Sequence, residues 1–257
     1  MSQSRLIHAV SSFVVLLVAV NPQAALGAEL RAANVKSPMS AEQSLQHFHL
    51  DSGLRIELVA AEPDVVDPVA VAFDEDGRLW VAEMRDYPDA PAEGQAPQSC
   101  IKILQDRDGD GRYEVAETFA EGLLYCTGLQ PWRGGVIATL SSKIAYLRDN
   151  DGDGRVDLCE SWFSGFQAQN SQHVLNHPTL ALDNRVYVAN GRADGQVVAV
   201  HEPWRISAQP LLMGGMDFRF DPISGQYDAV TGYGQFGLTF DEFGNRFICV
   251  NHVSGRH

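Results

Sequence analysis

The sequence predicts an all-β protein, and within that class a β-propeller built from four-stranded blades. From residue 54 onward, short runs rich in β-branched and aromatic residues dominate, and pairs of runs enclose Asp- or Gly-containing turns. The hairpin "AVAFDEDGRLWVAE" (70–83) is echoed by "LALDNRVYVAN" (180–190) and by "GLTFDEFGNRFICVN" (237–251). Hairpin units that recur at roughly 40–45 residues are the sequence sign of a propeller, with one blade for each repeat.

The composition is that of a globular protein. Hydrophobic residues make up 45% of the chain and charged residues 20%, which argues against disorder. The formal net charge of -14 disfavours nucleic acid and anionic membrane surfaces as partners, because both would repel an acidic protein. The charge does not argue against sugars and other uncharged molecules as substrates.

The first 27 residues have the layout of a secretory signal peptide. A weakly basic start, "MSQSRLIHAV", precedes the apolar "SSFVVLLVAV" and the small residues of "NPQAALGA", with cleavage expected after Gly27 or Ala28. We therefore expect an exported protein, either periplasmic or at the cell surface. An uncleaved membrane anchor is the alternative, although the apolar stretch is short for a span.

Residues 28–53 are predicted to form a leader with one short helix, and residues 54–257 the blades. In "SAEQSLQHFHL", Ser40 is the expected N-cap and Gln43, three residues later, completes a capping box. About 200 residues remain for the blades, which is enough for four to five of them. Because "FICVNHVSGRH" stops just beyond a strand, we expect the chain to be the front part of a longer protein.

Two acidic loops, "DRDGDGRYEVAE" (106–117) and "DNDGDGRVDLCE" (149–160), repeat one pattern. Each has carboxylates at loop positions 1, 3, 5 and 9 and a glycine at position 6, the spacing by which one short loop surrounds a hard cation with oxygens. The flanking "CIKILQ" and "KIAYLR" alternate like strands, so the loops belong to β-hairpins and not to EF-hands. The predicted metal is calcium, and its predicted ligands are Asp106, Asp108, Asp110, Glu114, Asp149, Asp151, Asp153 and Asp157.

Three further motifs leave alternatives open. In "SQHVLNHP", His173 and His177 have the spacing of a helical zinc pair, but Pro178 and the strand pattern after it disfavour a helix. His173 precedes the first strand of a predicted blade, where loops line the channel, and is therefore a candidate for proton transfer. "EMRDYP" places Arg85 either in a salt-bridged corner or against a substrate, and "GYGQFG", which a hairpin follows, is expected to form a crossing between blades.

The four cysteines allow disulfides in an exported protein. Cys100 and Cys126 bracket one repeat unit and form the favoured pair. Unpaired buried thiols are the alternative.

Several long motifs carry a resemblance to a known family. "LVAAEPDVVDPVAVAFDEDGRLWVAEMRDYP", the paired "DGDGR" loops, "LDNRVYVANG" and "QFGLTFDEFGNRFICVN" together resemble the membrane-bound dehydrogenase family found in planctomycetes and their relatives. The resemblance runs from Ser40 to the end of the chain. Members of this family resemble the quinoprotein sugar dehydrogenases, which are six-bladed propellers that use pyrroloquinoline quinone and calcium. The resemblance thus implies an incomplete propeller here, and in longer members a C-terminal cytochrome c-like domain.

The resemblance also implies site residues. Without gaps, the segment 173–191 is similar to the one that begins with the catalytic histidine of soluble quinoprotein glucose dehydrogenases, and His173 falls on that base. In that mechanism the histidine removes the proton of the substrate hydroxyl while hydride passes to the quinone. The position of a quinone-contacting arginine reads Tyr233 or Gly234 here. The candidate cofactor-binding residues are Arg85, Asn190 and Tyr233.

Three functions follow as hypotheses. The first, favoured by the resemblance, is an exported calcium-dependent dehydrogenase that oxidises a sugar or alcohol and passes electrons to a cytochrome c-type acceptor or a further domain. The second is a non-catalytic propeller that calcium stabilises and that binds glycans or proteins. The third is a lactonase-type hydrolase with a channel metal, for which Glu83 and Asn190 are two candidate ligands.

Overall fold

The computed structural model describes residues 38–192, 194–205, 209–251 and 253–256, and the expected signal peptide lies outside them. The chain divides into two compact units, Met1–Asp51 and Ser52–His257. In the first unit, helix α2 spans Ala41–Leu45 with Ser40 as its N-cap. Ser40 Oγ accepts a hydrogen bond from the Gln43 N–H at 3.2 Å, and Gln43 Oε1 accepts one from the Ser40 N–H at 3.1 Å. The predicted capping box is confirmed.

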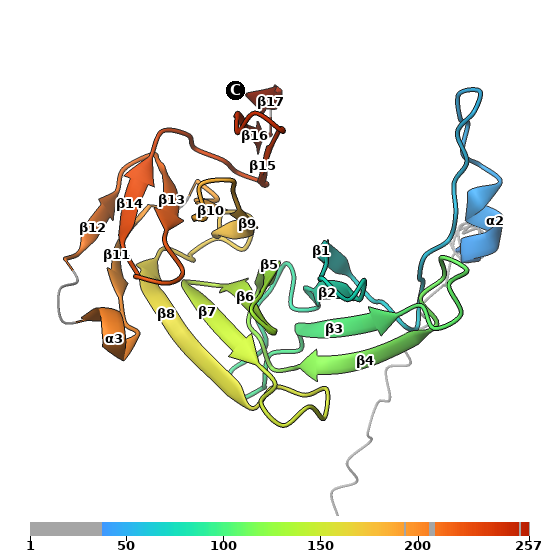
Figure 1. Cartoon of the computed structure of the whole chain (residues 1–257), viewed down its shortest axis with the longest axis horizontal. Helices are drawn as coiled ribbons and strands as arrows, with labels where there is room; N and C mark the ends of the chain where they lie inside the picture. Colours follow the sequence, from blue (N-terminus) through green and yellow to red (C-terminus); the bar gives the residue numbers. More distant parts are fainter. Residues whose placement is uncertain (1–37, 193, 206–208, 252, 257) are drawn as a thin grey trace, which may run out of the picture. The chain divides into compact units, whose positions relative to one another are not determined.

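The described part of the second unit is built almost entirely from antiparallel sheets (Figure 1). The first sheet contains, in spatial order, β1 (Pro68–Phe73), β2 (Leu79–Glu83), β3 (Cys100–Gln105) and β4 (Val115–Ala120). The second contains β5 (Cys126–Trp132), β6 (Gly135–Leu140), β7 (Lys143–Arg148) and β8 (Leu158–Phe166). The third contains β9 (Asn176–Leu180), β10 (Val186–Ala189), β13 (Asp217–Phe220) and β14 (Tyr227–Val230). The fourth contains β15 (Leu238–Phe240), β16 (Arg246–Val250) and β17 (Val253–Arg256).

The second sheet is larger than the predicted four strands. Between β10 and β13 the chain leaves the third sheet and forms β11 (Gly195–Ala199), the short helix α3 (Glu202–Arg205) and β12 (Leu211–Met213). Strand β11 pairs with β8, so that this insertion extends the second sheet to six strands. Trp204 of α3 stacks on Phe163 of β8 with ring centroids 5.6 Å apart, which fixes the insertion to the sheet that it joins.

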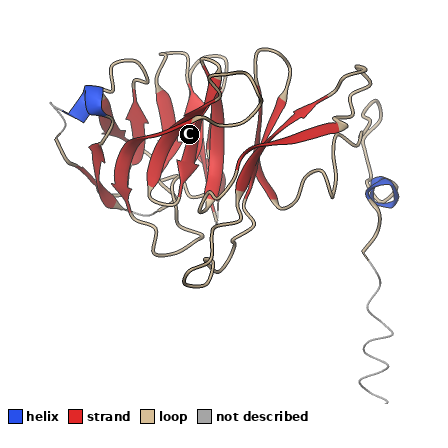
Figure 2. Ribbon diagram, turned by 90° about the horizontal axis from the view of Figure 1, so that it is seen from below, coloured by secondary structure: helices blue, strands red, loops and turns tan. Residues whose placement is uncertain are grey.

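The first strands of successive sheets lie next to one another. β1 contacts β5, β5 contacts β9, and β9 contacts β15, while the later strands of each sheet lie further outward (Figure 1). Figure 2 shows the strands of this unit side by side with the connecting loops at their two ends. This order of strands is that of a partial β-propeller, and the predicted all-β, four-stranded antiparallel architecture is confirmed in that form.

Apolar layers fill the spaces between neighbouring sheets. One layer joins side chains such as Trp80 and Phe119 of the first sheet to Leu129 and Leu147 of the second. A second layer joins the second sheet to the third through Phe163 and other buried residues. The second sheet contributes residues to both layers, which is why its strands β6 and β7 are buried along almost their whole length.

Gly191, which follows β10, is held in a place that only glycine fits. Its φ is +71°, its N–H donates to Gly234 O at 2.8 Å, and a Cβ atom would lie 1.9 Å from Val174 O. A left-handed conformation costs a non-glycine residue about 1–2 kcal/mol. Because the overlap with backbone adds to this cost, we expect Gly191→Ala to lower the free energy of unfolding by well over about 2 kcal/mol.

Gly244→Ala is the matched control in a denaturant titration of both variants. Gly244 has a φ of +81°, but no atom lies within 4 Å of the position that a Cβ would take, so this variant loses only the conformational part. Equal losses in the two variants would contradict the close approach at Gly191.

Candidate functional site

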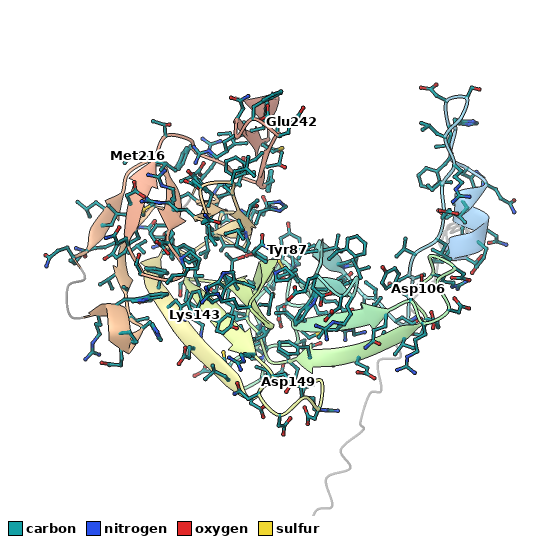
Figure 3. The ribbon with its side chains drawn as sticks, in the orientation of Figure 1. Tyr87, Asp106, Lys143, Asp149, Met216 and Glu242 are labelled. Carbon is teal, nitrogen blue, oxygen red and sulfur yellow. The ribbon has the colours of Figure 1, made fainter. Side chains whose placement is uncertain are left out.

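A cavity of about 740 Å³, hereafter the channel cavity, opens where the first strands of the sheets meet. Figure 3 shows Tyr87, which lines it, near the centre of the second unit and away from Asp106 and Asp149 at the outer ends of β3 and β7. Its walls come from the entry to β1, the end of β2, strand β5, the segment before β9, and the crossing into β15. The lining residues are Asp67, Pro68, Val69, Met84, Tyr87, Thr127, Ser171, Gln172, Val174, Asn176, His177, Gln235, Phe236 and Asn251.

The polar side chains of the channel cavity are mostly uncharged, and hydrogen bonds between segments hold them in place. Gln172 Nε2 donates to Tyr87 Oη at 2.7 Å, which links the segment before β9 to the loop after β2. Asn176 Nδ2 donates to Gln235 O at 2.8 Å, and Gln235 Oε1 accepts from the Asn251 N–H at 3.2 Å. Residues from four separate segments are therefore positioned together before any ligand binds.

His177 presents its ring to this cavity without a hydrogen-bond partner among the described residues. Its ring nitrogens make no hydrogen bond to any residue that the structure describes, and its backbone φ is +54°. The residue is exposed at the cavity surface, yet the surrounding walls desolvate the ring and lower its pKa from the ordinary 6.5. The neutral imidazole therefore offers one N–H donor and one lone pair to a ligand.

Gly128 allows the close approach of His177, and Gly237 lies in ordinary contact with its ring. A Cβ on Gly128 of β5 would lie 2.5 Å from the His177 backbone nitrogen, and one on Gly237 would lie 3.5 Å from the ring carbon Cγ. Gly237 ends the "GYGQFG" segment, which connects β14 to β15. The predicted role of that segment as a crossing between sheets is confirmed.

His173, the predicted base, lies half-buried in the turn between β8 and β9, and its backbone N–H donates to Asn170 O at 2.8 Å. Its neighbours Gln172 and Val174 line the channel cavity, but His173 is not among the lining residues. Its catalytic role stays a prediction. The structure instead places His177 at the cavity, a residue that the sequence marked only by its position four residues further on.

The three candidate cofactor-binding residues lie in three different places. Arg85 forms an ion pair with the fully buried Glu83, as the salt-bridged alternative predicted, and does not line the channel cavity. Asn190 is fully buried, and its backbone N–H donates to Asp217 Oδ1 at 3.1 Å. Tyr233 lines a second cavity, between the third and fourth sheets.

Glu83 is saturated by groups of the protein itself. Its Oε1 accepts the Val66 N–H at 2.9 Å and lies 3.3 Å from Lys102 Nζ, while its Oε2 accepts from Arg85 Nε at 2.8 Å and from the Cys100 thiol at 3.1 Å. Although burial alone would raise its pKa, these donors together lower it, so the carboxylate is ionised. Glu83 is therefore committed to the corner after β2.

The cysteines are unpaired in the structure, so the favoured pairing of Cys100 with Cys126 is not formed. Both of these thiols are buried, and burial raises the pKa of each to about 12. The Cys100 thiol is instead the hydrogen-bond donor to Glu83 described above.

The two acidic loops connect β3 to β4 in the first sheet and β7 to β8 in the second. Asp106 and Asp149 organise the two loops in the same way. One carboxylate oxygen of each accepts from the N–H three residues later, at 2.7 Å for Asp106 and 2.6 Å for Asp149. The other oxygen accepts from the N–H five residues later, at 2.8 Å in both loops. These backbone donors lower the pKa of both carboxyls. In each loop, three carboxylates have ligand atoms within 4.8 Å of one another and could hold one metal ion. They are Asp106, Asp108 and Glu114 in the first loop and Asp149, Asp151 and Asp153 in the second.

The predicted ligands at Asp110 and Asp157 lie outside these two groups. Asp110 Oδ1 accepts the Arg112 N–H at 2.7 Å, and Asp157 Oδ2 accepts the Asn150 N–H at 2.8 Å. The second loop also rests on the first sheet, because the Val156 N–H donates to Phe119 O at 2.9 Å. Order in this loop is thus coupled to the packing of two sheets.

Comparison with known proteins identifies a family for this chain. A family model described as a domain of unknown function (DUF7133) matches residues 40–257. No curated protein matches the sequence. An enzyme of carbohydrate-active enzyme family AA12 from Trichoderma reesei is similar over 59% of this chain and 38% of that one, at 18% identity and a TM-score of 0.39. A luciferin-regenerating enzyme is similar over 70% of this chain and 68% of that one, at 10% identity and a TM-score of 0.36.

This chain therefore spans well under half the length of the AA12 enzyme. Within the described residues, no helix is both long enough and apolar enough to cross a membrane.

Proposed function

The chain belongs to the DUF7133 family, whose model matches it from residue 40 to residue 257, and we propose that its propeller-like domain binds an uncharged sugar or a similar polyol in the channel cavity. The observation that carries this proposal is the neutral His177 ring, which faces the cavity without a hydrogen-bond partner among the described residues. Sugar hydroxyls both donate and accept, so one hydroxyl can accept from the ring N–H while another donates to the ring lone pair.

The rest of the lining supports the same ligand class. Tyr87, Gln172 and Asn251 add hydroxyl and amide groups, which pair with hydroxyls without requiring a charge. Met84 and Phe236 supply apolar surface for the C–H face of a sugar ring. The volume of about 740 Å³ is within the range of small-molecule sites, about 300–1,000 Å³.

The binding proposal is tested by equilibrium binding of a panel of uncharged mono- and disaccharides to the exported protein. We expect saturable binding of at least one of them, and weaker binding of the corresponding uronic acids, because Asp67 is the charged side chain of the lining and would repel a carboxylate. Tighter binding of the acidic sugars, or binding of neither class, would contradict the proposal.

We also propose that calcium occupies the two acidic loops and stabilises the outer hairpins. Their carboxylates are grouped in threes within reach of solvent, and the two that begin the loops are held ionised by backbone donors. Calcium requires such oxygen ligands. The loops lie away from the channel cavity (Figure 3), which supports a structural role for the metal. The signal-peptide layout of the first residues supports export to a calcium-rich compartment.

Pyrroloquinoline quinone, which the family resemblance implies, does not fit the channel cavity. The quinone is a planar tricarboxylate, and its carboxylates need cationic partners when they leave water. Of the residues that the structure describes, neither an Arg nor a Lys lines this cavity, and the lowered pKa keeps His177 neutral at pH 7. The second cavity does contain arginines, but no histidine is among the described residues that line it. The proposed function therefore contains no quinone-dependent step.

We expect reconstitution with pyrroloquinoline quinone and calcium to give no reduction of an artificial dye with any sugar or alcohol of a broad panel. The dehydrogenase hypothesis predicts turnover, and loss of a general base at His173 typically lowers a rate by about 10²–10⁴-fold. Turnover that His173→Gln abolishes would restore that hypothesis, together with its cytochrome c-type acceptor.

The lactonase hypothesis receives no support from its two candidate ligands. Glu83 is saturated by four protein groups, and Asn190 lines neither of the two cavities described above.

A further inference from the structure

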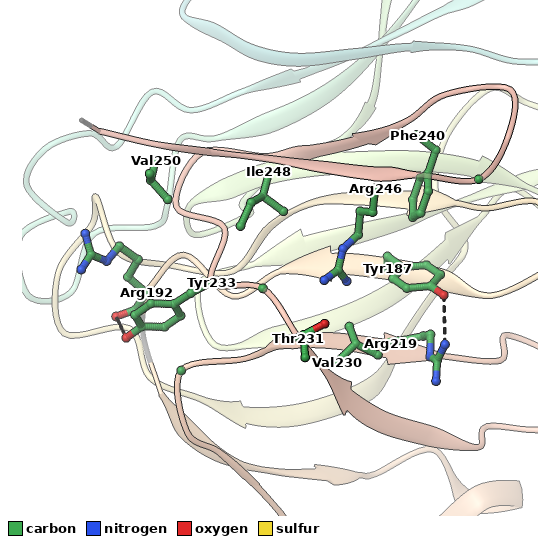
Figure 4. Close-up of a pocket in the computed structure, with 13 residues that line it drawn as sticks. Tyr187, Arg192, Arg219, Val230, Thr231, Tyr233, Phe240, Arg246, Ile248 and Val250 are labelled. Carbon is green, nitrogen blue, oxygen red and sulfur yellow. Dashed lines mark hydrogen bonds between the residues drawn. The ribbon is translucent and has the colours of Figure 1, made fainter. Parts of the chain in front are cut away.

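The second cavity, hereafter the arginine cavity, lies between the third and fourth sheets and has a volume of about 790 Å³ (Figure 4). Every charged residue in the described part of its lining is an arginine: Arg192, Arg219 and Arg246. In a chain with a net charge of -14, a cavity with three cations and no acid in its lining is unexpected. The proposed polyol site does not explain it, because the two cavities share no lining residue.

Arg219 is fully engaged by the protein. Its Nε donates to Asp228 Oδ1 at 2.9 Å, its Nη2 pairs with Asp228 Oδ2, and its Nη1 donates to Tyr187 Oη at 3.0 Å. The hydrogen bonds to Asp228 raise the pKa of the guanidinium further above its ordinary value. This arginine is a structural part of the cavity wall.

Arg246 is engaged only in part. Its Nη2 lies 3.8 Å from Asp217 Oδ2, too far for a hydrogen bond, and its Nη1 is buried without a partner among the described residues. Asp217 directs its other oxygen, Oδ1, to the N–H groups of Asn190 and Gly234. The guanidinium packs over the Tyr187 ring, with 5.5 Å from Cζ to the ring centroid. Arg246 therefore lines the cavity with a charge that the protein compensates only in part.

The backbone passes close to Arg246 at Gly232. A Cβ on Gly232 would lie 2.4 Å from Asp217 Oδ2 and 2.5 Å from Arg246 Nη2. Glycine at this position lets the chain pass the charged pair closely. Arg192 adds a second cation: it lies over the Tyr233 ring at 5.4 Å, and the structure gives it no carboxylate partner among the described residues.

The remaining wall is apolar. Phe240 packs edge-to-face on Tyr187 with ring centroids 5.0 Å apart. Ile248 and Val250 of β16 continue this apolar surface, and Val230 of β14 adds to it from the third sheet (Figure 4). Phe240 is paired with Arg246 across β15 and β16, and Ile248 lies two residues further along β16, so a ligand meets the Arg246 guanidinium and this apolar surface side by side.

We propose that the arginine cavity binds a small organic carboxylate, with the carboxylate beside the guanidinium of Arg246 and the planar apolar body against Phe240 and Ile248. A guanidinium and a carboxylate match in geometry as well as charge. Inorganic phosphate would leave the apolar wall uncovered.

Benzoate is the probe, benzyl alcohol is its neutral analogue, and inorganic phosphate is an anion without an apolar body. Each is titrated into the calcium-loaded protein, and binding is followed by ligand-observed NMR. Benzoate should bind saturably, at least about 10-fold tighter than either analogue. Only benzoate combines a carboxylate for Arg246 with an apolar ring for Phe240 and Ile248. Benzyl alcohol binding as tightly as benzoate, phosphate binding as tightly as benzoate, or no binding of benzoate would each overturn the proposal.

Arg246→Gln should weaken benzoate binding about 10- to 100-fold, the loss expected for a charge-assisted hydrogen-bond pair. Arg133→Gln is the matched control, because Arg133 packs over Trp132 at 5.0 Å in the same cation–π manner but lies outside the cavity. If Arg246→Gln fails to fold, Arg192→Gln replaces it, since Arg192 is exposed, and should also weaken binding. Unchanged affinity in the folded variants would contradict the assignment.

Discussion

His177→Ala is expected to weaken the binding of an uncharged sugar roughly 10- to 100-fold. The substitution removes a donor and an acceptor, and a neutral hydrogen bond contributes about 0.5–1.5 kcal/mol. Calorimetric titration with the tightest-binding sugar of the panel measures the change. Because the His177 ring makes no hydrogen bond within the described structure, the variant should fold as the wild type does.

His173→Ala is the matched control for this titration. It lies four residues earlier in the same segment, half-buried, and does not line the channel cavity. Its sugar affinity should equal that of the wild type. An effect of His173→Ala as large as that of His177→Ala would contradict the placement of the ligand at His177.

The same titration has an expected pH dependence. Desolvation lowers the pKa of His177 below 6.5, so the imidazole is neutral at pH 7 and loses its acceptor only in more acidic solution. Sugar affinity should therefore be constant above pH 6.5 and fall below it in the wild type, and stay flat in His177→Ala. The stability of the fold should change in the same direction. Because the His177 pKa is lower in the native state than in the unfolded state, the free energy of unfolding falls as the pH falls below 6.5.

Removal of calcium is expected to have the largest effect on stability. A ligand at 100 times its Kd adds about 2.7 kcal/mol to the free energy of unfolding. For a domain of this size each kcal/mol shifts the melting temperature by about 2–4 °C, so chelation should lower Tm by roughly 5–10 °C for each loop. Asp108→Ala combined with Asp151→Ala should remove most of the calcium-dependent rise in Tm.

Asp76→Ala is the control for the loop variants. Asp76 is an exposed carboxylate in the Asp-rich turn between β1 and β2, outside the two predicted metal groups. It should leave the calcium-dependent rise intact. A wild-type melting curve that chelator does not change would refute the metal assignment.

Local features of the fold could be predicted where neighbouring residues decide the structure. The capping box at Ser40 and Gln43 needs only residues three positions apart, and the acidic loops at Asp106 and Asp149 are built from backbone N–H groups three and five residues away. The insertion of β11 and β12 into the second sheet could not be predicted. It depends on the pairing of β11 with β8, far apart in the sequence, and on the packing of Trp204 against Phe163.

The candidate site is predictable only in part for the same reason. The motif singles out the segment from His173 to His177, but which histidine faces the cavity depends on the positive φ of His177 and on the space that Gly128 leaves. The three candidate cofactor-binding residues are each polar and near strand ends, yet the fold sends them to a salt-bridged corner, a buried position and a second cavity. The arginine cavity combines residues 187–250, which no local motif could have grouped.

A crystal structure of the calcium-loaded protein with its tightest-binding sugar tests the central claim most directly. We expect a sugar hydroxyl within hydrogen-bond distance, about 2.7–3.2 Å, of a His177 ring nitrogen, and a metal ion in each acidic loop. A sugar bound outside the channel cavity, or a quinone found within it, would contradict the proposed function.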